Sequence, residues 1–280
     1  MEGLLYDIHT KPGELHNFTI YSVLHQDARA ADKRRMYEHM DKRAALPNSH
    51  FLGIGDFGNF IMGFDPRMIA SVSDMDPEEQ DEYIDNVVRV QYERFRGYPW
   101  RMIGIGNHCT AVIKRYHTNP MKRLAERIGE YQKEHGEAAC QYAGYSGYAR
   151  FRFHLGSGTG AKTTFTILYH HGKWGGKNKG IIGAQHWSSF YDGWDVMAYG
   201  HNHATHAHHE TRLSMNQNGK LVDRDVAIVN TGTFLRGATQ GGTPEYSEIA
   251  AYPPVALACP LLKVIPGTHG VKWSIELGEC

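Results

Sequence analysis

The sequence predicts an α/β protein. In the first half of the chain, β-branched and aromatic segments alternate with long segments of helix-forming residues, an order typical of βαβ units with parallel strands. In the second half, short alternating segments dominate and indicate strands and hairpins. Residues with metal-ligating side chains follow the ends of several predicted strands. The 280 residues contain no internal repeat or linker, so we expect one domain over residues 1–280.

Three strands and three helices are predicted in the first half. The helix Ala30–Ala45 is rich in Ala, Arg, Lys, Met and Glu, which favour helices. A second helix begins at Asp76-Pro77-Glu78-Glu79, where an N-cap residue, a proline at the first position and acidic residues meet, and runs to about Phe95. The third helix occupies Pro120–His135. The strands are Phe18–Leu24, Phe51–Ile54 and Arg101–Ile105.

The second half is predicted to contain mainly strands. Tyr148–Phe153 alternates apolar residues with arginine, and Thr163–Tyr169 is rich in β-branched residues. A helix is predicted over Ile182–Tyr191. The remaining predicted strands are Trp194–Tyr199, Thr211–Met215, Asp225–Asn230, Leu261–Ile265 and Val271–Glu276.

Composition excludes several classes of protein. The formal net charge is +0, from 30 basic and 30 acidic residues, so no global field favours extended nucleic-acid binding, although a local patch would suffice for a short contact. The four cysteines are scattered without a CxxC pair, which argues against a disulfide framework or a cysteine zinc site. No apolar run spans a membrane and no signal-peptide pattern is present, so we expect a cytoplasmic protein without membrane association.

Polar residues with ligand chemistry follow five predicted strands. Because the carboxyl ends of parallel strands share one edge of a sheet, these residues are expected to converge. One polar strand end is ordinary, but five in one chain indicate a site. Imidazoles combined with carboxylate and amide oxygens suit zinc, manganese or iron. The candidates are His25, Asp27, Asp56, Asn107, His108, His170, His171, His201 and His203.

The order of these motifs resembles the calcineurin-like metallophosphoesterase family, most closely its short bacterial and phage members. The resemblance is carried by Gly55-Asp56, Gly106-Asn107-His108, His170 at a strand end, and Gly200-His201-Asn202-His203, within about Phe18 to Leu235. It implies a four-layer α/β/β/α sandwich and a metal-dependent phosphoesterase. It also implies two divalent metal ions, of which manganese is expected and iron or zinc would also fit. A phosphate diester such as a nucleotide or nucleic acid is the implied substrate.

The resemblance also implies a role for each residue. Asp56 would bridge the two ions. Asn107, His170 and His201 would bind the second ion, and His25 and His203 the first. His108 would act as proton donor to the leaving oxygen, a role that suits an imidazole at neutral pH.

One position departs from the family pattern. The first motif, Asp-x-His, reads Val23-Leu24-His25, so a carboxylate is missing. Asp27 would share a face with His25 in an extended chain and could supply the missing carboxylate. Alternatively, Asp27 could be a surface or helix-capping residue. The open alternatives to an active phosphodiesterase are therefore a phosphomonoesterase and a non-catalytic binding protein on the same fold.

Two further assignments concern the segment after Thr163–Tyr169. Alternation along a strand allows only one of His170 and His171 to face the site, and by the resemblance it is His170, with His171 beside the substrate. Lys173 and Lys177 lie in a glycine-rich basic loop, Lys173–Gly180, which is predicted to clamp a phosphate or to form a surface turn. His206, His208 and His209 are expected on a loop.

Overall fold

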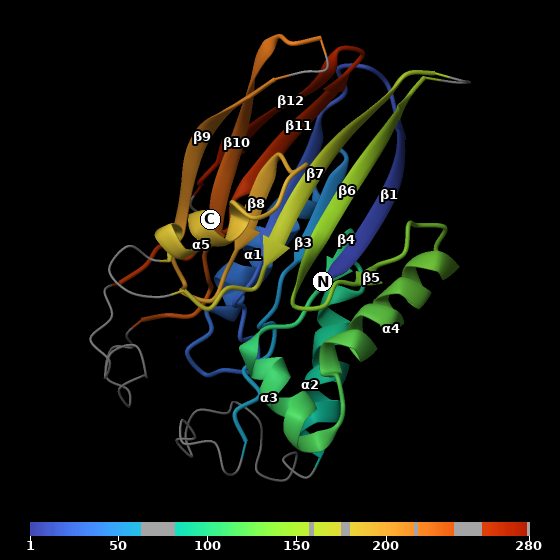
Figure 1. The fold of residues 1–280 in the computed structure, drawn as a ribbon. Helices are drawn as coiled ribbons and strands as arrows, with labels where there is room; N and C mark the ends of the chain where they lie inside the picture. The colour runs from blue at the N-terminus through green and yellow to red at the C-terminus, as the bar shows by residue number, and fades with distance from the viewer. Residues whose placement is uncertain (63–81, 157–159, 175–179, 216–217, 238–253, 279–280) are drawn as a thin grey trace.

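The chain folds as a mixed α/β structure, in agreement with the predicted class (Figure 1). The structure is a computed structural model that describes residues 1–62, 82–156, 160–174, 180–215, 218–237 and 254–278. Within these residues there are two six-stranded sheets, each with parallel and antiparallel pairs, and five helices.

The first sheet is built around parallel strands. β2 pairs with β3, β3 with β4 and β4 with β5, all in parallel, whereas β11 joins β2 and β12 joins β11 in antiparallel pairs. The carboxyl ends of β2, β3 and β4 therefore lie at one edge. In spatial order the strands are β12 (Gly270–Glu276), β11 (Leu261–Gly267), β2 (His16–Tyr21), β3 (Ser49–Gly53), β4 (Trp100–Ile103) and β5 (Gln141–Tyr142).

The second sheet combines a parallel centre with two antiparallel pairs. β7 and β8 are parallel, and β8 and β10 are parallel, while β6 with β7 and β10 with β9 are antiparallel. β1 lies at the far edge, parallel to β6. In spatial order the strands are β1 (Glu2–Thr10), β6 (Ser146–Leu155), β7 (Lys162–His170), β8 (Val196–Tyr199), β10 (Leu221–Thr231) and β9 (Thr205–Met215).

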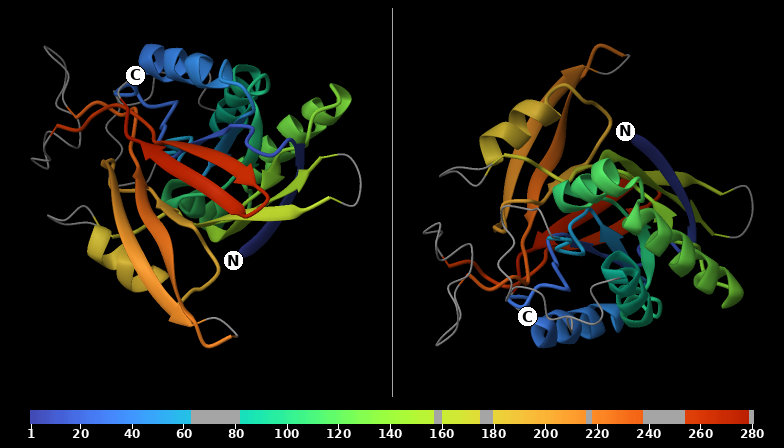
Figure 2. Two further views of the ribbon diagram at one scale, coloured as in Figure 1. Left: turned by 90° about the horizontal axis from the view of Figure 1, so that it is seen from above. Right: turned by 90° about the horizontal axis from the view of Figure 1, so that it is seen from below.

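Helices cover the sheets on opposite sides, as Figure 2 shows for α1 and α5. Four helices share one apolar cluster with residues of β3 and β4 of the first sheet, and α5 shares another with residues of β7, β8 and β10 of the second sheet. The helices are α1 (Lys33–Ala44), α2 (Tyr83–Phe95), α3 (Asn107–Tyr116), α4 (Pro120–Glu134) and α5 (Ile181–Ser188).

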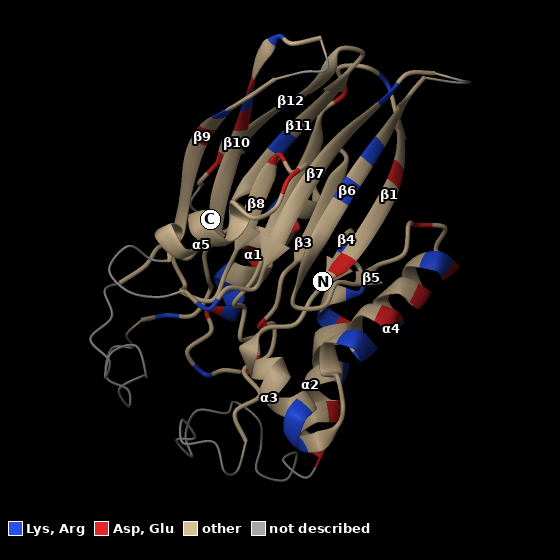
Figure 3. Cartoon of the chain, in the orientation of Figure 1, with Lys and Arg blue, Asp and Glu red and all other residues tan. Residues whose placement is uncertain are grey.

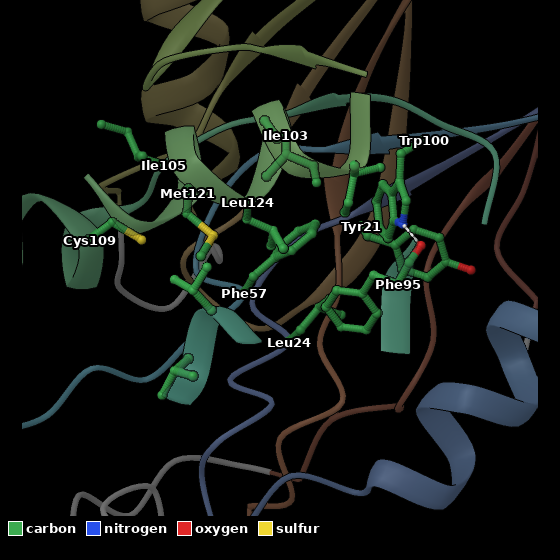
Figure 4. Close-up of a cluster of buried hydrophobic side chains, with 14 of the residues drawn as sticks. Tyr21, Leu24, Phe57, Phe95, Trp100, Ile103, Ile105, Cys109, Met121 and Leu124 are labelled. Carbon is green, nitrogen blue, oxygen red and sulfur yellow. Dashed lines mark hydrogen bonds between the residues drawn. The ribbon is translucent and has the colours of Figure 1, made fainter. Parts of the chain in front are cut away.

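The cluster beneath α1 to α4 combines aliphatic side chains with a packed group of aromatic ones, of which Figure 4 labels Tyr21, Phe57, Phe95 and Trp100. Trp100 is fully buried, with its ring centroid 5.1 Å from that of Phe57 and 5.5 Å from that of Tyr21. Its indole N–H donates to the Phe95 carbonyl at 3.1 Å, which satisfies the polar atom of a buried tryptophan. This cluster anchors β2, the loop of Phe57 and α2 to one another, and so fixes the loops that follow β2 and β3.

A separate cluster fills the space between the two sheets. Phe18 of β2 packs against Phe151 of β6 with ring centroids 4.6 Å apart, and against Phe165 of β7 at 6.2 Å. Leu52 and Val229 belong to the same cluster. Because residues of both sheets meet here, the carboxyl ends of β2, β3 and β4 are held close to those of β7 and β8.

Three elements were not predicted from the sequence. β1 carries its buried residues at even positions, Leu4 and Tyr6, but exposed Leu5 obscures the alternation. α3 begins at Asn107, where only a strand-end motif was expected, and buries Cys109 and Val112. β5 is two residues long. The predicted helix start at Asp76-Pro77-Glu78-Glu79 lies outside the described residues.

Two predicted elements differ in extent or type. β9 runs from Thr205 to Met215, so His206, His208 and His209 lie on an edge strand and not on the expected loop. The pairing of β9 with β10 over eleven residues extends the hairpin well beyond the predicted segments.

None of the described helices has the length and apolar character that crossing a membrane requires.

The buried imidazole of His39 makes stability dependent on pH. Burial lowers the pKa of His39 to about 3, and its Nδ1 lies 3.1 Å from the Tyr21 hydroxyl. Because the neutral ring is favoured in the folded state, its contribution is complete above pH 6.5 and is lost as the pH falls from 6.5 towards 3, at about 1.4 kcal/mol per pH unit. His39→Gln, which cannot titrate, should reduce the slope of unfolding free energy against pH by about one proton in urea titrations between pH 7 and 5. An unchanged slope would contradict this account.

Candidate metal centre

The strand-end loops are joined by backbone hydrogen bonds that continue the sheets. Beyond β2 and β3, the N–H of Val23 donates to Gly55 at 3.0 Å and the N–H of His25 donates to Asp56 at 3.1 Å. Beyond β7 and β8, the N–H of Gly200 donates to His171 at 3.0 Å. These bonds place the candidate side chains of each sheet next to one another. The interface between the sheets then brings the two sets together.

Asp56 lies at the centre of the site. It is 2% exposed, and its Oδ2 is 3.0 Å from Nε2 of His171, while its Oδ1 accepts the backbone N–H of His108 at 3.2 Å in the first turn of α3. Burial raises the pKa of the Asp56 carboxyl, but the adjacent rings of His171 and His108 outweigh burial and hold that pKa well below its ordinary value. Asp56 is therefore a buried anion in a histidine environment.

Two acceptor oxygens converge on one nitrogen of His171. Its Nδ1 lies 3.0 Å from the Ile54 carbonyl, which can only accept, so this nitrogen carries a hydrogen. Its Nε2 lies 3.0 Å from Oδ2 of Asp56 and 3.1 Å from Oδ1 of Asn107. A proton on Nε2 or a metal ion beside it would hold these atoms together. A ring whose other nitrogen donates to a backbone carbonyl is also the usual state of a metal-ligating histidine.

His201 completes a set of four side chains, which we call the second ligand group: Asp56, Asn107, His171 and His201. Nδ1 of His201 is 2.8 Å from Oδ1 of Asn107, and ligand atoms of Asp56, His171 and His201 lie within 4.8 Å of one another. Burial lowers the pKa of His201, which favours the neutral ring that metals bind. Two oxygens and two imidazole nitrogens suit a first-row divalent ion.

A first ligand group lies on the other side of Asp56 and consists of His25, His203 and the shared Asp56, with His108 next to it. Ligand atoms of His25, Asp56 and His108 lie within 4.8 Å of one another, and the ring of His203 is 5.7 Å from that of His25. Burial, and then His108, lowers the pKa of His25 well below its ordinary value, and burial lowers that of His203 to about 4. Both rings are therefore neutral at physiological pH.

Nδ1 of His25 is a buried polar atom without a hydrogen-bond partner in the described part of the chain. Leaving such an atom unsatisfied costs about 1–3 kcal/mol. A metal ion bound by this ring would remove that cost. The residues present therefore fit an ion on each side of Asp56. On one side Nδ1 of His25 has no hydrogen-bond partner among the described residues, and on the other the oxygens of Asp56 and Asn107 converge on His171.

Close approach explains the glycines that flank these residues. A Cβ on Gly106 would lie 2.1 Å from Oδ1 of Asp56, and a Cβ on Gly55 would lie 2.6 Å from Nδ1 of His171. Gly55 also has a φ of +111°, which side chains rarely adopt. Both positions thus require glycine for the ligands to meet.

Backbone strain is concentrated at the same place. Among the described residues, eight other than glycine have positive φ, and five of them lie in these loops: Val23, His25, Asp56, His201 and His203. A β-branched residue with φ of 54°, as at Val23, is unusual. Each such residue costs about 1–3 kcal/mol, and clusters of them are typical of functional sites.

The structure places His171, and not His170, beside Asp56. Along β7, Ile167 and Tyr169 face the first sheet and Leu168 faces α5, so His170 points away from the site. Its ring packs on Trp174 and Trp187, with centroids 4.9 and 4.7 Å away. The assignment of His170 as ligand and of His171 as a substrate contact is therefore corrected. The register of β7 cannot be read from sequence alone, so two adjacent histidines could not be distinguished there.

Asp27 does not take the place of the missing carboxylate. Its oxygens accept the backbone N–H of Asn59, the N–H of Phe60 at 3.2 Å and the hydroxyl of Tyr83. The carbonyl of Asn59 in turn contacts Nδ1 of His108. Asp27 thus holds the loop that orients His108, a connection that no sequence motif signals because Tyr83 is 56 residues away.

The substrate-side lysines are only partly described. Lys173 is exposed next to Trp174, and Lys177 lies outside the described residues. Nδ2 of Asn202, within the His201–His203 turn, donates to the Trp174 carbonyl at 3.3 Å and so ties the start of the basic loop to the site. The three histidines of β9 have other contacts, such as His206 with the Tyr199 hydroxyl at 2.8 Å.

The two adjacent histidines provide a matched test of the ligand assignment. His171→Ala should lose the ion of the second ligand group, whereas His170→Ala should keep it, because only His171 faces Asp56. Elemental analysis of purified, dialysed protein measures the difference, with circular dichroism to verify folding. Equal loss in both variants would contradict the assignment.

The two buried aspartates provide a second test. Asp27→Asn should keep its metal and lose about 1–3 kcal/mol of unfolding free energy, because one of its donors is left without an acceptor. Asp56→Asn should lose metal. Urea titration and elemental analysis on both variants measure these effects, and metal loss in Asp27→Asn would show that Asp27 is a ligand.

Comparison with models of known protein families and with curated proteins finds no match for this chain. The function must therefore be inferred from the side chains themselves and from the order of the short motifs that carry them.

Proposed function

We propose that the chain is a metal-dependent phosphoesterase that hydrolyses phosphate diesters. One observation carries the proposal: a single buried carboxylate, Asp56, lies between two sets of imidazoles, with ligand atoms of each set within 4.8 Å of one another. Asp56 and the imidazoles beside it would hold two divalent ions, with manganese expected and iron or zinc as alternatives. Such ions would supply positive charge for the phosphoryl oxygens and activation of water near neutral pH.

The proposal includes the fold of the metallophosphoesterase family. Two sheets with apolar residues between them, four helices on one and α5 on the other, are consistent with a single-domain, four-layer α/β/β/α sandwich. The motif order Gly55-Asp56, Gly106-Asn107-His108 and Gly200-His201-Asn202-His203 supports the same assignment.

His108 is the proposed proton donor. Its Nδ1 is held by the Asn59 carbonyl, so Nε2 is the atom from which a proton would pass to the leaving oxygen. His108 is the second residue of α3, whose N-terminal N–H groups favour an anion such as phosphate at this end of the helix. A positioned acid of this kind contributes about 10²- to 10⁴-fold to a rate.

A diester of small size, such as a nucleotide or a short nucleic-acid segment, is the proposed substrate class. Lys173 adds one exposed positive charge near the site. Along α4, basic and acidic residues lie side by side, as Figure 3 shows. Such a mixed surface does not favour binding of a long nucleic acid, which needs a continuous basic track.

The test is hydrolysis of bis(p-nitrophenyl) phosphate with added Mn²⁺. Wild type should turn over, and His108→Asn should lose at least about 100-fold in kcat. His208→Ala, an exposed histidine of β9, is the matched control and should retain full activity. The same assay with p-nitrophenyl phosphate separates a diesterase from a monoesterase.

No turnover by wild type, together with no effect of His108→Asn, would favour the alternative of a non-catalytic binding protein. That alternative has a specific basis, since Val23 stands where the family has its first metal-binding aspartate.

A further inference from the structure

We propose that the two ligand groups are unequal: the second group holds one ion firmly, and the first group takes its ion weakly and exchangeably. The inference rests on the proposed function, since it concerns the ions that such an enzyme would use. If the first group binds its ion weakly, the concentration of free metal ions decides whether that group is occupied.

The second ligand group has four donors that are already in place. Asp56, Asn107 and His171 meet through contacts of 3.0 and 3.1 Å, and His201 adds a contact of 2.8 Å to Asn107. The Ile54 carbonyl orients His171, and the start of α3 positions Asn107. Such preorganised ligands bind an ion without reordering the loops.

The first ligand group has no carboxylate of its own among the described residues. Its donors are imidazoles and the shared Asp56. Position 23 carries a fully buried valine, which has no donor atom, and Asp27 is engaged by three donors of the neighbouring loop and α2. Nδ1 of His25 nevertheless has no hydrogen-bond partner among the described residues, so this nitrogen is available to bind an ion.

Charge makes the asymmetry larger. Within the two groups, Asp56 is the one carboxylate available to two divalent ions, so the second ion to bind meets repulsion that is compensated only in part. The donor types differ as well. An imidazole-rich group favours zinc-like ions over magnesium or manganese, whereas the oxygens of Asp56 and Asn107 make the second group more tolerant of manganese.

Metal retention provides the first test, and its readout does not depend on activity. Protein loaded with Zn²⁺ or Mn²⁺ and dialysed against metal-free buffer should retain about one ion per chain by elemental analysis. Calorimetric titration should then show a second, weaker site that binds Zn²⁺ more tightly than Mn²⁺. His203→Ala should keep the retained ion, and His171→Ala should lose it. Retention of two ions or none, or loss of the retained ion in His203→Ala, would overturn the proposal.

Position 23 provides the second test. Val23→Asp adds a carboxylate and should tighten the weak site at least about tenfold and raise retention towards two ions. Val23→Asn has the same shape with a neutral amide oxygen in place of the charge and is the matched control, which should tighten the weak site less than Val23→Asp does. Both residues tolerate positive φ better than valine, so both should fold. Equal effects of the two substitutions would overturn the role of the missing charge. If Val23→Asp does not fold, the comparison of His203→Ala with His171→Ala still decides.

Each of the two proposals can be contradicted without contradicting the other. One retained ion with no ester hydrolysis would sustain the unequal groups and reject the phosphoesterase. Two firmly retained ions with hydrolysis would reject the unequal groups and sustain the phosphoesterase.

Discussion

A buried carboxylate between two sets of imidazoles is the constraint on which the rest of the site depends. Asp56 is ionised although burial opposes ionisation, because histidine rings and the first turn of α3 surround it. Neutral histidines at the same place, such as His25 and His203, have their pKa values lowered by burial. A buried carboxylate with imidazoles such as those of His25 and His203 beside it is a good arrangement for binding a cation.

Strain is the second physical feature of the site. Five loop residues have positive φ, and a Cβ at either of two glycines would collide with Asp56 or His171. This backbone conformation holds the donor atoms close together. The cost is balanced by the apolar clusters beneath the loops, in which Trp100 and Phe57 are fully buried. Rigid strands under strained loops are how a fold keeps ligand atoms in place before any ligand arrives.

Hydrophobic pattern predicted most of this fold. Strands such as β3 and β7 and the helices α1 and α4 were found from alternation and helix propensity, because those signals are local. β1 and α3 were missed, since an exposed Leu5 and a strand-end motif at Asn107 masked their periodicity. Their identity depends on pairing with β6 and on packing against α4, which are tertiary facts.

The same distinction holds at the site. The ligand types could be read from strand-end motifs, because parallel strands bring their carboxyl ends together. The choice between His170 and His171 depended on the register of β7, and the role of Asp27 depended on Tyr83 in a distant helix. Neither is encoded in local spacing. Pattern therefore indicated metal-ligating residue types at the strand ends, and the geometry shows which of these side chains lie together.

The candidate metal ligands come from both sheets. His25, Asp56 and Asn107 follow strands of the first sheet, and His171, His201 and His203 follow strands of the second. A bound ion would thus act as a cross-link between strands of the two sheets whose ligands are 64 or more residues apart in the chain. Since an ion that binds only the folded state adds its binding free energy to stability, the rigidity with which the two sheets are held together would vary with the metal content of the surroundings.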